Sequence, residues 1–142
     1  MQIISYDDSR HREQVIGLWR SVFGYREARN EPAASLDRKL AVRDGLLFVA
    51  VKDGAVIGTV MAGYDGHRGW IYSLAVRQED RLLGAGRSLL ERAETALAGL
   101  GCVKINLQIL KDNGSVRDFY VKNGYKVEER ISMGKEILKN QR

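Results

Sequence analysis

The chain is poor in cysteine and histidine. Cys102 is the single cysteine, so no disulfide can form within the chain, and the sequence predicts a protein of the reducing cytoplasm. His11 and His67 lie far apart in the sequence, and neither belongs to a pattern of metal-ligand spacing. We therefore expect no metal site.

Long apolar runs and a leader pattern are also missing. The sequence holds no stretch of about 18 apolar residues, which predicts that no helix spans a membrane. Residues 1–8 lack a basic start, a long apolar stretch and a small-residue cleavage site. They do not resemble a signal peptide.

The charged residues form no block of one sign. The 23 basic and 18 acidic side chains leave a net charge of +5, spread along the sequence. This distribution argues against a nucleic-acid-binding tail but favours anionic ligands such as a phosphorylated cofactor. The chain is 44% hydrophobic and 29% charged, as in ordinary globular proteins, and its 142 residues predict one domain over residues 1–142.

Hydrophobic periodicity predicts a mixture of strands and helices. Strands at 46–51, 55–61 and 70–76 should form an antiparallel meander, and the strand–helix–strand crossover around 70–109 should join parallel strands. The expected fold class is α/β, with a mixed sheet of six or seven strands and about four helices in the order β-α-α-β-β-β-α-β-α-β-β. The remaining expected elements are a strand at 2–6, helices at 9–23, 35–44 and 87–97, a strand at 103–109, a helix opened by Asn113, and a final hairpin at 125–129 and 130–138.

The most informative stretch is Arg81-Leu82-Leu83-Gly84-Ala85-Gly86, which lies between an apolar strand and an amphipathic helix. Two glycines at such a turn allow the backbone to turn sharply and bring its N–H groups close to a ligand. The helix start adds unsatisfied N–H donors and the positive end of the helix dipole. These features predict a site for phosphate or pyrophosphate, although many glycines at helix starts serve only the turn.

Two well-known phosphate-binding loops fit this stretch poorly. The dinucleotide fingerprint would need a small residue where Leu89 stands, with an acidic residue about 20 positions later. The P-loop would need Lys and then Ser or Thr after its last glycine, whereas this chain has Arg87-Ser88.

Two motifs together resemble those of the GNAT superfamily of acyl-CoA-dependent N-acetyltransferases. The family's coenzyme-binding pattern, Gln or Arg followed by x-x-Gly-x-Gly or Ala, is matched by residues 81–86. A later pattern, Asn-x-x-Ala-x-x-x-Tyr-x-x-x-Gly-Phe, is matched from Asn113 to Tyr125, with Val116 for Ala and Tyr125 for Phe. The resemblance covers nearly the whole chain, and residues 63–69 further resemble a bacterial subgroup of small, poorly characterised members.

The resemblance implies acetyl-CoA as the co-substrate, without a metal. Backbone N–H groups of residues 82–88 would hold its pyrophosphate, and Arg81 and Arg87 are either phosphate contacts or solvated basic residues. Leu74 and Val76 would pair their backbone with the pantetheine amides between splayed strands, and the Leu74 N–H near a bulge would polarise the thioester carbonyl. The implied coenzyme-binding residues are Leu74, Ala75, Val76, Arg81, Leu82, Leu83, Gly84, Ala85, Gly86, Arg87, Ser88 and Asn113.

Asn113 and Tyr120 each have a structural and a functional interpretation. Asn113 is either a helix cap or a coenzyme contact. Tyr120 follows Val116 by one helical turn, on the face expected to meet the core. The resemblance implies that Tyr120 is the catalytic residue, a general acid for the departing CoA thiolate. A phenol with a pKa of about 10 can protonate a thiolate whose conjugate acid has a pKa of about 8.5.

The implied reaction is direct attack of a primary amine on the acetyl thioester in a ternary complex. The amine must first lose a proton, because an alkylammonium with a pKa of about 10 is not nucleophilic. Asp65, His67, Glu128, Glu129 and an ordered water relay are the candidate bases, and the sequence does not choose among them.

The sequence does not decide whether the acceptor amine belongs to a small molecule or to a protein or peptide. Trp19 and Tyr25 either line its pocket or belong to the core. No membrane partner is expected, nor a nucleic acid, and a homodimer stays open. A non-catalytic acyl-CoA-binding or regulatory module of the same fold is the alternative to an enzyme.

Overall fold

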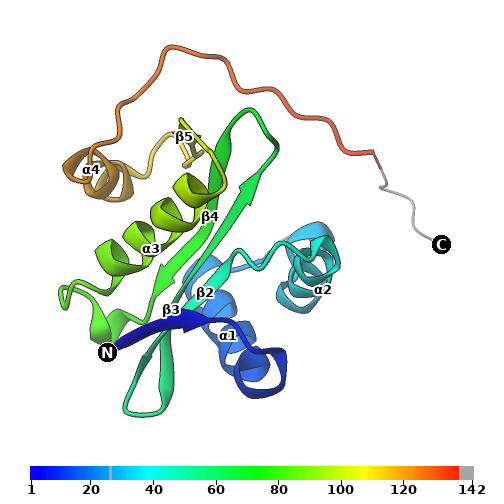
Figure 1. Cartoon of the computed structure of the whole chain (residues 1–142), viewed down its shortest axis with the longest axis vertical. Coiled ribbons are helices and arrows are strands. Elements are labelled where there is room, and N and C mark those ends of the chain that lie inside the picture. The colour runs from blue at the N-terminus through cyan, green and yellow to red at the C-terminus, as the bar shows by residue number, and fades with distance from the viewer. Residues whose placement is uncertain (26, 138–142) are drawn as a thin grey trace. The chain divides into compact units, whose positions relative to one another are not determined.

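A computed structural model of the chain describes residues 1–25 and 27–137 (Figure 1). The chain divides into two units, Met1–Gln108 and Ile109–Arg142. The first unit holds the sheet and three of the α-helices, and the second holds one helix and the C-terminal segment. The expectation of one domain over residues 1–142 stays a prediction.

A five-stranded mixed sheet with the strand order β1-β2-β3-β4-β5 forms the centre of the first unit. Strands β1 to β4 are antiparallel neighbours, whereas β5 runs parallel to β4. The predicted meander and the predicted parallel crossover are therefore confirmed. The strands are β1 (Gln2–Ser5), β2 (Leu47–Lys52), β3 (Ala55–Tyr64), β4 (Gly69–Val76) and β5 (Ile105–Asn106).

The sheet has fewer strands than the six or seven expected from the sequence. Residues 103–109 alternate as a strand should, but only Ile105–Asn106 pair with a neighbour. Residues 125–137, expected to form a hairpin, contain no helix or strand; Leu138 lies outside the described residues. Alternation fixes the face on which a side chain lies, but it does not supply a partner for the backbone, so it overestimates strand length.

The helices agree well with the predicted ones except at one start. The second helix begins at Pro32, three residues before the expected Ser35, because proline fits the first helical position, where its missing N–H costs nothing. It ends before Arg43, which has a left-handed φ of 59°. The helices are α1 (Asp8–Phe23), α2 (Pro32–Val42), α3 (Ala85–Gly99) and α4 (Gly114–Lys122), with short 3-10 turns η1 (Ala28–Asn30) and η2 (Gln78–Asp80).

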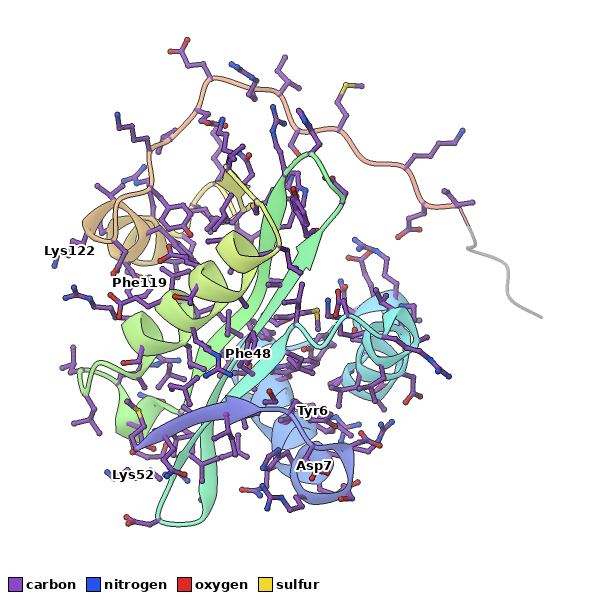
Figure 2. All side chains as sticks on the ribbon, in the orientation of Figure 1. Tyr6, Asp7, Phe48, Lys52, Phe119 and Lys122 are labelled. Carbon is purple, nitrogen blue, oxygen red and sulfur yellow. The ribbon has the colours of Figure 1, made fainter. Side chains whose placement is uncertain are left out.

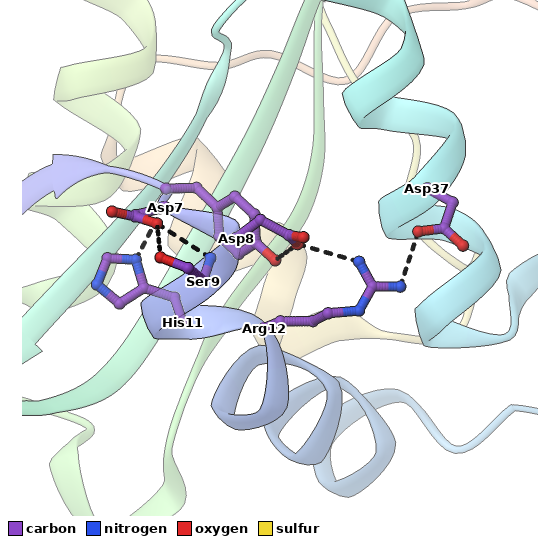
Figure 3. Close-up of polar contacts among 7 residues, drawn as sticks. Asp7, Asp8, Ser9, His11, Arg12 and Asp37 are labelled. Atoms are coloured by element: carbon purple, nitrogen blue, oxygen red, sulfur yellow. Dashed lines mark hydrogen bonds and ion pairs between the residues drawn. The ribbon is translucent and has the colours of Figure 1, made fainter.

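The start of α1 is held by a polar network (Figure 3). Asp7 accepts a hydrogen bond from the Ser9 N–H at 3.0 Å, and its own N–H donates to His11 Nδ1 at 3.0 Å. Burial lowers the pKa of His11, which favours the neutral ring that this bond requires. Arg12 then bridges Asp8 at 3.0 Å and Asp37 at 2.7 Å, which ties α1 to α2.

Helices α1 and α3 cover opposite faces of the sheet. Successive strand residues point to opposite faces. The Thr59 side chain bonds Trp19 of α1, whereas a Cβ on the neighbouring Gly58 would meet Leu89 of α3. On the α3 face, the Arg92 guanidinium lies 4.9 Å from the ring centroid of Phe48, which is labelled in Figure 2. Because both faces are covered, the central strands are almost continuously apolar.

The helices of the described residues do not include one that is both long and apolar enough to cross a lipid bilayer.

We expect Gly58→Ala to destabilise the fold. A Cβ at this position would lie 2.9 Å from the Ala75 carbonyl oxygen and 2.9 Å from Leu89 Cδ1, so the β3–β4 ladder or α3 must shift. Overpacking of this kind costs about 1–3 kcal/mol. The free energy of unfolding from urea denaturation measures the effect.

Gly63→Ala is the matched control, because it lies in the same strand and its Cβ would come no closer than 3.9 Å to Tyr72. Its free energy of unfolding should change by less than about 0.5 kcal/mol. Equal losses for the two variants would contradict the close packing of Gly58.

Candidate functional site

The segment that follows β4 is anchored by a buried carboxylate. Asp80, at the end of η2, is 3% exposed. It accepts a hydrogen bond from Arg77 Nε at 2.6 Å, and Lys52 Nζ lies 3.5 Å away. The bond from Arg77 holds the pKa of Asp80 below its usual value. This anchor was not among the residues predicted from the sequence, where the Arg77-x-x-Asp80 spacing is its available signal.

The turn into α3 presents backbone N–H groups rather than side chains. Leu82 and Gly84 have left-handed φ angles of 73° and 83°. Gly84 is the N-cap of α3, and it has no side chain to occupy the helix start. The Ser88 N–H donates to the Gly84 carbonyl at 3.0 Å, so the N–H groups of residues 85–87 precede the first intrahelical bond. This arrangement is a cradle for an anion.

The side chains around the cradle leave it open. Leu82 and Leu83 are exposed, and a Cβ placed on Gly84 would meet no atom of the described residues within 4 Å. Arg81 Nε donates to the Val76 carbonyl at 3.3 Å, which turns this side chain back toward the end of β4. Arg87 forms an exposed pair with Glu91 at 3.3 Å, and such a pair opens at little cost.

One side of β4 lacks a neighbouring strand over most of its length. The β4–β5 ladder consists of Gly69↔Ile105 and Trp70↔Asn106. From Ile71 to Val76, β4 has no strand partner on its β5 side within residues 1–25 and 27–137. The short ladder is compatible with the splaying that the resemblance implies, which stays a prediction. An exposed strand edge of this kind can pair with an extended ligand.

A β-bulge interrupts β4 just before Leu74. Thr59 pairs with Ala75 and Met61 pairs with Tyr72, so Ser73 and Leu74 together face the single residue Val60. Ser73 has a left-handed φ of 50°, which is strained for a residue with a Cβ. Ala75 is buried, whereas Leu74 and Val76 are half-buried. The structure thus places residues 74–76 and 81–88 in one continuous segment along the open edge and into the cradle.

The second unit carries the other two predicted site residues. Asn113 is the N-cap of α4 and accepts a hydrogen bond from the Val116 N–H at 3.4 Å. Tyr120 is 8% exposed, with ring centroids 5.2 Å from Phe119 and 5.5 Å from Tyr125. Burial raises the pKa of Tyr120 to about 12. The phenol is therefore protonated throughout the physiological range.

The candidate bases and pocket residues lie in varied surroundings. Asp65 Oδ1 accepts hydrogen bonds from the N–H groups of His67 and Arg68, both at 2.7 Å, and these bonds lower the pKa of Asp65. A carboxylate committed to a turn in this way is a weak base. His67 is exposed in the same turn, and Glu128 and Glu129 are exposed in the second unit.

Of the two aromatic residues considered for the acceptor pocket, Trp19 belongs to the core. It is fully buried, and its indole N–H is bonded to Thr59. Tyr25 is half-buried, and burial raises the pKa of its phenol to about 12. Tyr25 is therefore the one that reaches the surface.

A small cavity of about 140 Å³ lies elsewhere in the first unit, between β1, α2 and the start of β2. Lys39 at its wall forms an ion pair with Asp44 at 2.8 Å. Because β1 and β5 are opposite edges of the sheet, this cavity is separate from the open edge of β4. Within the part of the chain that the structure describes, no cluster of three His, Cys, Asp or Glu side chains could hold a metal ion.

Known proteins resemble this chain in sequence and in fold. The sequence profile of the Acetyltransferase (GNAT) family matches residues 12–125. Acetyltransferase YE1169 of Yersinia enterocolitica is 38% identical over 129 residues, which cover 91% of this chain and 91% of that protein.

Two solved structures share the fold. The aminoglycoside 6'-N-acetyltransferase AAC(6')-IG of Acinetobacter haemolyticus has a TM-score of 0.77 at 17% identity, over 96% of this chain and 99% of that one. AAC(6')-Iy, solved with the bisubstrate analogue CoA-S-monomethyl-acetylneamine, has a TM-score of 0.76 at 18% identity, over 96% and 97%. Taken together with the match to the family profile and the relative at 38% identity, these observations show that the chain belongs to the GNAT family of acetyltransferases.

Proposed function

We propose that this chain transfers an acetyl group from acetyl-CoA to a primary amine. The observation that carries the proposal is the open edge of β4, which leads through η2 to the start of α3, where Gly84 supplies no capping side chain. An extended ligand with amides at one end and a pyrophosphate at the other matches this path. The complex of AAC(6')-Iy with a CoA-linked analogue supports the same choice of donor.

Each part of the coenzyme has a complementary group in the first unit. We assign the pyrophosphate to the N–H groups of residues 82–87, because the Ser88 N–H is already bonded to the Gly84 carbonyl, and Arg81 and Arg87 are close enough in sequence to add positive charge. The backbone of Leu74 and Val76 pairs with the pantetheine amides, as an added strand would. In the second unit, we assign Asn113 a coenzyme contact from the motif, in addition to its cap.

The reaction is an addition followed by an elimination. The lone pair of the neutral amine attacks the thioester carbonyl carbon, a C–N bond forms, and the carbonyl oxygen becomes an oxyanion that accepts a hydrogen bond from the Leu74 N–H. The C–S bond then breaks, and its electron pair leaves with sulfur. The carbonyl carbon has then gained a C–N bond and lost its C–S bond, and the products are an amide and the thiol of CoA.

Tyr120 donates a proton to the departing sulfur. The phenol has a pKa of about 12 and is a weaker acid than the thiol, whose pKa is about 8.5. Proton transfer from the phenol alone to the fully formed thiolate is therefore unfavourable. The proton released by the attacking amine returns the phenolate of Tyr120 to the phenol, so no net proton is gained or lost. Because the amine nitrogen becomes a strong acid once it is acylated, the net transfer of its proton through the phenol to sulfur is downhill, and we assign Tyr120 the donor role in this transfer.

A non-catalytic acyl-CoA-binding module is the second candidate. It is favoured by the commitment of the Asp65 carboxylate to the 65–68 turn, which removes one candidate base. Thiol release from acetyl-CoA across a panel of small amines, aminoglycosides and peptides separates the two. Coenzyme binding without thiol release on any amine would favour the module.

We expect Gly84→Glu to lower the affinity for CoA by about a hundredfold or more. The carboxylate would stand beside the pyrophosphate, and like charges in contact cost several kcal/mol. Isothermal titration with CoA measures the change. Since Gly84 has a φ of 83°, any side chain adds backbone strain, and Gly84→Ala is the control that carries the strain without the charge. Equal affinities for the two variants would place the pyrophosphate elsewhere.

Tyr120→Phe should lower kcat by roughly a hundredfold or more, because the variant keeps the ring but loses the proton donor. The affinity for CoA and the thermal midpoint should change little. In the wild type, a phenol with a pKa of about 12 stays protonated as the pH rises, so the rate should show no alkaline decline up to about pH 10. An unchanged kcat in the variant would assign the proton to another group.

A further inference from the structure

We propose that Thr59 and Trp19 are positioning residues that fix the direction of the Leu74 N–H. Both lie outside the predicted coenzyme-binding set, and both are fully buried. Trp19 Nε1–H donates to Thr59 Oγ1 at 2.8 Å, and Thr59 Oγ1–H donates to the Ser73 carbonyl oxygen at 2.8 Å. The chain of hydrogen bonds runs from α1 through β3 to the bulge of β4.

The direction of each hydrogen bond in this chain is determined by chemistry. The indole N–H of Trp19 can only donate, and the Ser73 carbonyl can only accept. Thr59 must therefore accept from the first and donate to the second, so its hydroxyl proton has one orientation. A hydroxyl held at both ends in the interior is a more rigid support than one facing solvent.

The Ser73 carbonyl and the Leu74 N–H belong to the same peptide group. In a planar trans peptide, the C=O and the N–H point in opposite directions, and the described residues include no cis peptide bond. By holding the Ser73 carbonyl toward β3, Thr59 directs the Leu74 N–H away from β3. We infer that the Leu74 N–H thereby faces the open edge of β4, beyond its pairing with β5 at Gly69 and Trp70.

The strain at Ser73 explains why such a support is needed. A residue with a Cβ at a φ of 50° costs free energy, and it keeps this conformation only when its surroundings impose it. Without the Thr59 hydroxyl, the bulge could relax toward an ordinary ladder, and the peptide group could turn. The buried Trp19–Thr59 bond and the part-buried Thr59–Ser73 bond hold it in place.

This inference rests on the proposed function, in which the Leu74 N–H hydrogen-bonds the thioester carbonyl. The test therefore needs a signal that does not require an acceptor amine. The carbonyl stretching frequency of acetyl-CoA labelled with ¹³C at the thioester carbon reports the hydrogen bond directly. It is measured by difference infrared spectroscopy on the bound donor.

Thr59→Val keeps the shape of the side chain and removes the hydroxyl. We expect the carbonyl stretch of bound acetyl-CoA to move to higher frequency, and kcat to fall about tenfold or more, because loss of an oxyanion donor acts in the transition state. The Kd for CoA, which has no acetyl carbonyl, should change less than about threefold. Thr59→Ser should restore both the frequency and kcat.

Two further variants make the result interpretable. Thr95→Val makes the same change on the exposed surface of α3 and should leave the frequency at the wild-type value. If Thr59→Val does not fold, Thr59→Ala removes the hydroxyl without adding a second methyl group, and the same frequency shift is expected.

The outcomes separate the two proposals. A wild type that binds no acetyl-CoA would overturn both. A wild type that binds acetyl-CoA while the Thr59 variants show the wild-type frequency and kcat would overturn only the positioning role. A lower thermal midpoint with unchanged frequency and kcat would mean that the pair serves stability alone, which also overturns it.

Discussion

The register between β3 and β4 is the constraint on which the first unit depends. Thr59 pairs with Ala75 and Met61 pairs with Tyr72, so one residue of β3 faces two of β4. That single extra residue bends β4 at Ser73 and changes which backbone groups face the open edge. On the other side of the same register, Gly58 lets α3 approach the sheet closely, because Leu89 occupies the space that a side chain would need. Because helix α3 starts at the anion cradle, the register between β3 and β4 also helps to set where the cradle lies against the sheet.

Features that depend on local sequence were predictable. Hydrophobic periodicity located α1 to within one residue and the β2–β3 hairpin, and the two glycines located the start of α3 to within two residues. The assignment of a coenzyme site to residues 74–76 and 81–88 comes from the resemblance and stays a prediction. In each case the physical cause, a cap, a turn or a missing Cβ, acts within a few residues of the chain.

Features that depend on distant partners were not predictable in the same way. Nothing near Thr59 in the sequence shows that its hydroxyl meets Trp19, 40 residues earlier, and Ser73, 14 residues later. From the sequence, Asp80 is expected to be a surface carboxylate, yet its side chain is buried and its charge is paired with Arg77 and Lys52. Strand β5 is short because parallel pairing requires a neighbour at the right distance, and the alternation of apolar residues carries no such information.

The open side of β4 also links the stability of the sheet to the supply of its ligand. A strand that lacks a partner strand along one side is a place where another chain can add and where aggregation begins. A ligand that binds there at a hundred times its Kd stabilises the folded state by about 2.7 kcal/mol through mass action. This is a substantial share of the free energy of unfolding, which is only about 5–15 kcal/mol for a typical domain. The thermal denaturation midpoint and the solubility of this chain would then follow the coenzyme A concentration around it, so the cell's acyl-carrier pool would help to keep the protein folded.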